Sequence, residues 1–231
     1  MTSRWLASAA ALLFGVGGIA SQTGTALAKC DPHRTPPNFL VSKAGWEHDA
    51  GARVGGVSGS EFNYSPWVYN SSTYNYSLGV VELADGPDEA NTAYLGWIEY
   101  AGGTRETYWQ WTVNGTLYNA EGTAFPTGDF TTYQIDYGNP VGDFGFYVNG
   151  SLVDSETSAW APQSAMMEGR IFNWSSQMPG DTSTAEQWKT GRIYLNGSWQ
   201  SFDGQTINSN NSIYASQNNS NSWQIIWDRA C

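Results

Sequence analysis

The chain has 231 residues, of which 40% are hydrophobic, and 21 Asp and Glu against 10 Lys and Arg give a formal net charge of −11. This acidic balance argues against nucleic acid or an anionic membrane as a partner, because both would repel the protein. The two histidines, His33 and His48, leave little material for a Ser-His-Asp triad or a histidine-based zinc site. We therefore expect neither a metal nor another cofactor.

The first 28 residues have the pattern of a secretory signal peptide. Arg4 gives a basic start, residues 5–20 are mostly apolar, and Ala26-Leu-Ala28 offers a small-x-small cleavage site. The apolar run is short for a membrane span, and no later segment approaches the roughly twenty apolar residues that a span needs. We expect a secreted, extracellular monomer in which residues 29–231 form a single domain.

The two cysteines, Cys30 and Cys231, stand at the two ends of the mature chain. In an oxidising compartment they could bridge, and closing so long a loop stabilises by on the order of 5 kcal/mol in the chain-entropy model. A reactive thiol is the less favoured alternative for an even pair of terminal cysteines. A bridge would leave no cysteine to act as a nucleophile.

Asn-Gly between β-forming residues occurs in Val113–Leu117, Val148–Leu152 and Leu195–Trp199. This dipeptide is a strong hairpin signal, because a type I′ turn needs positive φ at both central positions. The same Asn-Gly-Ser/Thr triplets match the glycosylation sequon, but the turn interpretation is favoured. The strands expected beside the turns are Thr107–Val113, Thr116–Asn119, Phe144–Val148, Ser151–Ser155, Arg192–Leu195 and Ser198–Phe202.

Short strands and Gly-rich turns dominate the rest of the chain and predict an all-β fold, an antiparallel β-sandwich or jelly roll. Residues 29–45 are expected as an extended lead-in, Thr184–Lys189 as at most one helical turn, and the Asn- and Ser-rich stretch 206–222 as a surface loop. Further strands are expected at Gly79–Leu83, Ala93–Tyr100, Thr131–Tyr137, Glu168–Ser175 and Ser222–Trp227.

Two apolar strands each carry one chemically capable side chain, Tyr94 in Asn91–Trp97 and Glu168 in Ala165–Ile171. Desolvating an ion costs several kcal/mol, so a carboxylate in such a strand needs a reason. Glu168 could have a raised pKa and serve as a general acid or base. Alternatively it forms a buried ion pair with Arg170 or another arginine, and periodicity alone slightly favours that alternative.

The aromatic strand around Trp109 sorts into two faces, because side chains alternate along a strand. Trp109 and Trp111 lie on one face, and Tyr108 and Gln110 lie on the other. Core packing is the favoured role for any single tryptophan. The second face could line a groove in which rings stack on sugars or hold an extended peptide.

Most other acidic residues stand in turns beside Gly or Pro, which is typical of solvated side chains. Carboxylates in loops could also hold calcium, but no calcium-loop pattern is present. These turn residues are Asp85, Asp88, Glu89, Asp129 and Asp143.

Four segments resemble, in order and rough spacing, the neprosin-like proteins, a group related to the glutamic peptidases. The resemblance covers roughly residues 90 to 200. It implies a concanavalin-like sandwich of two curved antiparallel sheets with a cleft on one concave face. It also implies a glutamate that works in acid with a second Glu or Gln to activate water and polarise the scissile carbonyl. The segments are Asn91–Trp97, Thr104–Thr112, Met167–Ile171 and Ser176–Gly180.

Carried over residue by residue, the resemblance places Glu168 on the family glutamate and Gln177 in the Gln-Met-x-x-Gly turn. Trp97 matches the Gly-Trp of the other catalytic strand. Tyr94 stands where the family has Glu or Gln, and a phenol with a pKa near 10 cannot exchange roles with a carboxyl in acid. The catalytic pair implied by the family is therefore incomplete. Gln110, on the same predicted face as Glu106, could supply the missing amide.

These observations lead to two hypotheses. The first is a secreted, neprosin-like hydrolase of acid pH, inactive if Tyr94 abolishes catalysis, with Glu168 as base and Tyr94 or Gln110 as hydrogen-bond donor. The second is a non-catalytic, lectin-like module that binds an extended peptide or a polysaccharide in an aromatic cleft. The substrate-binding residues expected are Trp97, Trp109, Trp111 and Gln177.

Overall fold

The structure, a computed structural model, describes residues 41–51, 53–69, 75–86, 89–103, 105–124, 128–138, 142–172, 176–181, 183–208, 213–217, 223–228 and 231. The expected signal peptide and Cys30 lie outside this part of the chain. The described residues form the strands β1–β15 and no helix, and none of them forms a helix long and apolar enough to span a membrane. The expected all-β sandwich is confirmed.

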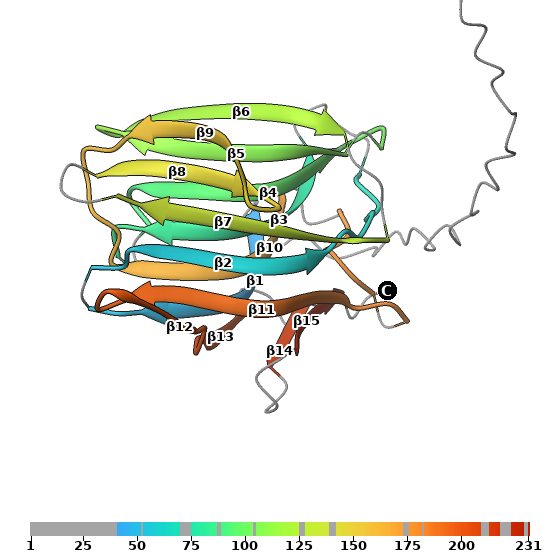
Figure 1. Ribbon diagram of the computed structural model, residues 1–231. Coiled ribbons are helices and arrows are strands. Elements are labelled where there is room, and N and C mark those ends of the chain that lie inside the picture. The colour runs from blue at the N-terminus through green and yellow to red at the C-terminus, as the bar shows by residue number, and fades with distance from the viewer. Residues whose placement is uncertain are drawn as a thin grey trace, which may run out of the picture.

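Two antiparallel sheets stack face to face, as Figure 1 shows. The seven-stranded sheet has the order β13 (Gln205–Asn208), β1 (Val41–Asp49), β10 (Ser164–Phe172), β3 (Tyr76–Ala84), β4 (Thr92–Tyr100), β5 (Arg105–Val113), β6 (Thr116–Ala124). The eight-stranded sheet has the order β14 (Ile213–Gln217), β15 (Trp223–Asp228), β11 (Glu186–Leu195), β2 (Gly56–Phe62), β7 (Phe130–Tyr137), β8 (Asp143–Val148), β9 (Ser151–Thr157), with β12 (Ser198–Ser201) paired to β11.

The three Asn-Gly turns form the hairpins that the sequence predicts, joining β5 to β6, β8 to β9 and β11 to β12. Both central residues of each turn have positive φ, as a type I′ turn requires. Their φ values are 50° and 75° at Asn114 and Gly115, 50° and 78° at Asn149 and Gly150, and 52° and 81° at Asn196 and Gly197.

Three expectations about local structure are wrong in part. Thr184–Lys189 makes no helical turn, because β11 begins at Glu186 and pairs with β2 and β15. The stretch 206–222, expected as a loop, contains β14 and most of β13. The expected lead-in 29–45 enters β1 at Val41. For β1, β11 and β13 partner strands distant in sequence supply the hydrogen bonds, which local composition does not reveal. β14 pairs instead with β15, the next strand along the chain.

The hydrophobic core fills the space between the sheets, and a second apolar cluster lies on the opposite side of the seven-stranded sheet. The core side chains include Trp46, Trp97, Trp188, Tyr133 and Phe144. We call the opposite side the outer face, meaning the face turned away from the eight-stranded sheet. Strand alternation assigns residues to the two faces. The outer-face cluster consists of Leu78, Val80, Tyr94, Ile98 and Tyr108.

Close contact between β3 and β4 depends on glycine. A Cβ atom at Gly96 would lie 1.9 Å from the carbonyl oxygen of Gly79, and backbone cannot give way as a flexible side chain can. Gly138, by contrast, has room, since its nearest neighbour would lie 3.5 Å away. Gly96 therefore sets how closely the two strands that carry Tyr94 and Glu82 approach.

We predict that Gly96→Ala lowers the free energy of unfolding by about 2–3 kcal/mol, the usual cost of overpacking a tight site. Gly138→Ala is the matched control and should leave the unfolding midpoint nearly unchanged. Urea unfolding followed by tryptophan fluorescence measures both. Equal stability of the two variants would contradict the role assigned to Gly96.

Candidate functional site

The candidate site lies on the outer face of the seven-stranded sheet, where β10, β3 and β4 run side by side. Glu168 and Arg170 are two residues apart on β10, so alternation points both to the same side. Glu82 pairs with Met166 on one flank and with Tyr94 on the other. The register therefore brings together Glu168 and Tyr94, the two residues singled out from the sequence, and adds Glu82.

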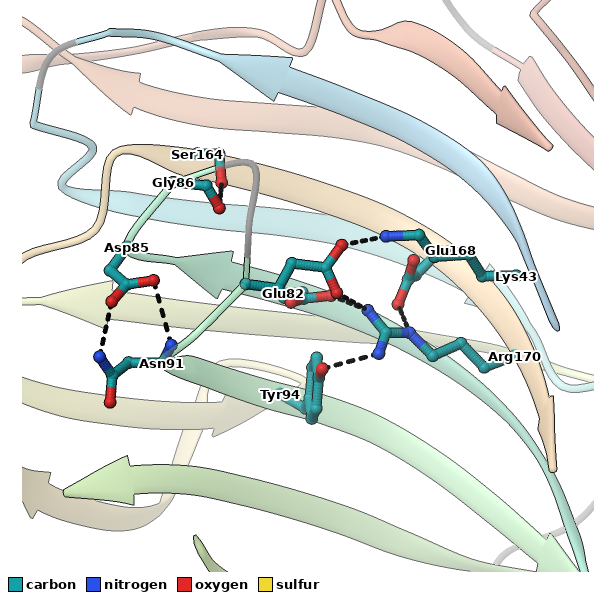
Figure 2. A network of polar contacts seen from close by, with 10 residues as sticks. Lys43, Glu82, Asp85, Gly86, Asn91, Tyr94, Ser164, Glu168 and Arg170 are labelled. Carbon is teal, nitrogen blue, oxygen red and sulfur yellow. Dashed lines mark hydrogen bonds and ion pairs between the residues drawn. The ribbon is translucent and has the colours of Figure 1, made fainter. Parts of the chain in front are cut away.

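Arg170 is the centre of this site (Figure 2). Its Nε donates to Glu168, its Nη1 donates to Tyr94 Oη at 2.8 Å, and its Nη2 donates to Glu82 Oε2 at 2.8 Å. Nη2 also donates to Glu89 Oε2 at 2.9 Å, and the guanidinium carbon lies 4.9 Å from the centre of the Tyr94 ring. One arginine thus contacts all four side chains.

The site is closed to solvent in this arrangement. The side chains of Glu82 and Glu168 are 0% exposed, Tyr94 is 8% exposed and the Arg170 side chain 12%. Lys43 pairs with Glu89 at the margin of the cluster. A water molecule or a substrate carbonyl has no access to Glu168 while these contacts hold.

Burial and charge together set the protonation of the cluster. Burial raises the pKa of Glu82 well above its usual range, while Arg170 lowers it and the charge of Glu168 raises it further. Burial also opposes the charge of Arg170, but Glu168 and Glu82 more than offset this and raise its pKa. Arg170 is therefore a fixed cation at any ordinary pH.

Glu82 and Glu168 also contact each other. Their remaining oxygens, Glu82 Oε1 and Glu168 Oε2, receive no N–H or O–H from the described residues. Two buried carboxyls that lie close together disfavour a second negative charge. The charge of Glu168 accordingly adds to burial in raising the pKa of Glu82, which favours the protonated form of Glu82.

Tyr94 is a neutral phenol in this cluster. Burial, followed by the nearby charge of Glu82, raises the pKa of its phenol well above 10. Its oxygen accepts the hydrogen bond from Arg170. The phenol therefore stays protonated and serves as a structural partner of Arg170.

The other predicted site residues separate between the two faces. Gln110 lies on the outer face opposite Tyr94, and its Oε1 accepts a 2.6 Å hydrogen bond from Tyr108. Gln177 is buried away from this site and binds the Tyr64 hydroxyl and the Trp67 amide.

The three predicted tryptophans lie on the core side of the sheet. Trp97 is fully buried and donates to Glu61, whereas Trp109 donates to Asp154 on β9 at 2.6 Å. Trp111 stacks on Tyr118 with ring centres 5.7 Å apart. The tryptophans therefore pack between the sheets and do not line the outer face beside Tyr94, which departs from their expected role in binding substrate.

Sequence reasoning missed Glu82 and misjudged Glu89. Glu82 follows an apolar run, Leu78-Gly-Val-Val81, so the argument applied to Glu168 could have found it. The placement of Glu89 among ordinary solvated turn residues is wrong. Burial would raise the pKa of Glu89, but pairing with Arg170 and Lys43 lowers it below its usual value. Such pairing across strands leaves no local signal.

The described residues contain no group of three or more His, Cys, Asp or Glu side chains that could hold a metal ion. The acidic side chains of the site are instead arranged around a cation of the protein itself. The arrangement fixes charge and geometry, because the guanidinium of Arg170 is oriented by four acceptor side chains at once.

The sequence matches no known protein family and no curated protein. Solved structures do resemble it. A scytalido-glutamic peptidase with a transition-state analogue inhibitor overlays with a TM-score of 0.59 at 12% identity, covering 81% of this chain and 98% of that one. The peptidase SCP-B, an eqolisin in complex with the tripeptide Ala-Ile-His, gives 0.57 at 13% identity with the same coverage.

A β-glucanase of Bacillus licheniformis also overlays, with a TM-score of 0.38 at 13% identity, covering 77% of this chain and 68% of that one. From the two peptidase structures, the fold is that of a glutamic-peptidase-like β-sandwich.

We predict that Arg170→Met destabilises the protein by about 3–5 kcal/mol near neutral pH, the usual cost of leaving buried charges unpaired. The loss should be smaller in acid. Without Arg170 the pKa of Glu82 rises further above its unfolded value, so stability present in acid is lost as the pH rises through that range. Thermal unfolding at about pH 4 and pH 7.5 measures the difference.

Arg192→Met is the matched control, because Arg192 is exposed on β11 and lies over the Trp199 ring. It should change stability little at either pH. An Arg170→Met variant that is destabilised equally at both pH values would contradict the role of the carboxylates.

Proposed function

We propose that this protein, as a neprosin-like relative of the glutamic peptidases, binds an extended peptide on the outer face of its seven-stranded sheet and does not cleave it. One observation carries the proposal. Arg170 occupies the carboxylate of Glu168, and both are held in a cluster in which Glu82 and Glu168 are 0% exposed.

Peptide hydrolysis needs a base that reaches water and a donor that reaches the developing oxyanion. Glu168 is engaged by Arg170, and the Tyr94 oxygen accepts from the same guanidinium. Breaking these contacts would strand buried charges at a cost of several kcal/mol. A glutamic peptidase would need the carboxylate of Glu168 free for catalysis, whereas here that carboxylate takes part in contacts that stabilise the fold.

Polar side chains that could bind a ligand lie beside the closed cluster on the outer face. Gln110 and Tyr100 on the outer face are half-buried, with Tyr100 donating to Glu121 at 2.5 Å. Amide and phenol groups on a sheet face are suited to an extended chain, whose backbone offers alternating donors and acceptors. The two peptidases of similar fold were solved with an inhibitor and with a tripeptide, which favours a peptide over a polysaccharide as the ligand.

A second candidate function is hydrolysis in acid. The raised pKa of Glu82 beside Glu168 favours it, because a carboxyl pair of this kind can supply one acid and one base. Glu82 would then take the place that Tyr94 leaves vacant in the family pattern. This candidate requires Arg170 to leave Glu168, which the contacts above oppose.

We predict that a panel of extended peptides binds the mature protein, as measured by isothermal titration calorimetry, whereas oligosaccharides do not. Gln110→Ala should weaken peptide binding several-fold, the effect of losing one hydrogen bond. Gln200→Ala, an exposed glutamine on β12 of the other sheet, is the control and should bind as the wild type does. Binding of oligosaccharides alone would replace the peptide with a glycan as ligand.

We also predict that the wild type cleaves denatured protein substrates no faster than Glu168→Gln between about pH 3 and pH 7. Released amino termini, quantified by a fluorogenic amine reagent, provide the measurement. Cleavage by the wild type that Glu168→Gln abolishes would overturn the non-catalytic proposal and establish the second candidate.

A further inference from the structure

A second pair of carboxyl groups lies inside the sandwich, on the opposite side of the seven-stranded sheet from Arg170. Glu61 on β2 and Glu186 on β11 belong to adjacent strands of the eight-stranded sheet, and both side chains are 0% exposed. Glu61 reaches across to the seven-stranded sheet, where Trp97 Nε1 donates to its Oε1 at 2.9 Å. The pair therefore connects the two sheets.

Few hydrogen-bond donors surround these two carboxyl groups. Neither the second oxygen of Glu61 nor either oxygen of Glu186 receives a well-formed hydrogen bond from an N–H or O–H of the described residues. The two carboxyls interact with each other instead, because the charge of Glu186 adds to burial in raising the pKa of Glu61. Buried together with so few donors, the pair is favoured in a state in which at least one carboxyl is protonated.

Glycine on the facing sheet makes room for the pair. A Cβ at Gly79 would lie 1.6 Å from Glu61 Oε1, so the carboxyl occupies the space that a side chain would otherwise fill. The close fit fixes Glu61 between Gly79 and Trp97. A carboxylate there cannot turn toward solvent when it loses its proton.

The neighbouring ionisable groups come from three strands and two loops and do not neutralise the pair. Arg105 on β5 is the nearby cation and lowers the pKa of both glutamates, but it lies over the Trp97 ring at 5.6 Å and donates to the Tyr64 carbonyl. The remaining groups are anionic or neutral. They are Tyr133 on β7, Glu99 on β4, and Tyr64 with its partner Asp181 in the loops.

Burial dominates the acid–base behaviour that results. It raises the pKa of Glu186 to about 7. Burial, followed by the charge of Glu186, raises the pKa of Glu61 well above its usual range. Because the two groups interact, they titrate as a pair, with both protonated in acid and the first proton leaving near neutrality.

We propose that the Glu61–Glu186 pair is a proton-dependent latch between the two sheets, closed in acid and weakened as the surroundings become neutral. The proposal does not depend on whether the outer face binds or cleaves a ligand. It assigns the protein a working environment on the acid side of neutrality.

The direction of the effect follows from linkage. A carboxyl whose pKa is higher in the folded state than in the unfolded state takes up protons on folding, so stability falls as the pH rises above the unfolded value. For Glu186 the pKa rises from 4.5 in the unfolded chain to about 7 in the folded protein. This shift increases the equilibrium constant for unfolding by on the order of a hundredfold between about pH 5 and pH 8.

The decisive variant is Glu61→Gln/Glu186→Gln. It keeps the side-chain volumes and lets the two amides hydrogen-bond to each other, but it has no group that loses a proton in this pH range. Chemical unfolding between about pH 5 and pH 8 should show that the variant loses most of the wild-type dependence on pH. Asp143→Asn, at an exposed position on β8, is the control and should keep the wild-type dependence. An unchanged dependence in the double variant would overturn the proposal.

Infrared difference spectroscopy tests the latch if the double variant does not fold. It is applied to folded Glu82→Gln, which removes the carboxyl pair of the outer face. A protonated-carboxyl band that persists at about pH 6 and declines toward pH 8 supports the latch. Absence of that band at about pH 6 overturns it.

Discussion

Burial of acidic side chains is the constraint on which this structure depends. Carboxylates lie on both sides of the seven-stranded sheet at positions with no exposure to water, and each must receive either a cation or a proton. On the outer face Arg170 supplies the cation for Glu168 and Glu82. Between the sheets burial raises the pKa of Glu61 and Glu186, which favours protonation of that pair. The outer cluster has a guanidinium at its centre, which keeps its charge at ordinary pH.

The arginine also determines what the outer face can do. A carboxylate held by a fixed guanidinium stabilises a fold, whereas a catalytic carboxylate must be free to exchange protons with water and substrate. The neighbouring strands still present amide and phenol groups, including Gln110 and Tyr100. In the proposed function, the chain keeps a glutamic-peptidase-like fold while the carboxylate of Glu168 is held by Arg170 and the neighbouring polar groups bind the ligand.

Much of the fold could be predicted because its signals are local. The Asn-Gly turns encode positive φ at two successive positions, and alternation along β4, β5 and β10 assigns each side chain to a face. β1 and β2 escaped prediction because they contain glycines and polar residues that only their partner strands make compatible with a sheet. The family resemblance suggested that Tyr94 and Glu168 lie close together. That Arg170 binds Glu168 could be proposed from the sequence only as an alternative to a catalytic role for Glu168.

The sequence by itself determined the class of the fold, the hairpins, and the two strands on which the outer-face site is built. The tertiary structure alone decided that Glu82 and Glu89 join that site and that Arg170 lies at its centre. It also decided that Glu61 meets Glu186, which is 125 positions later in the chain. The physical reason is that periodicity reports which way a side chain points, whereas the charge state of a buried group depends on neighbours that register and sheet packing bring to it.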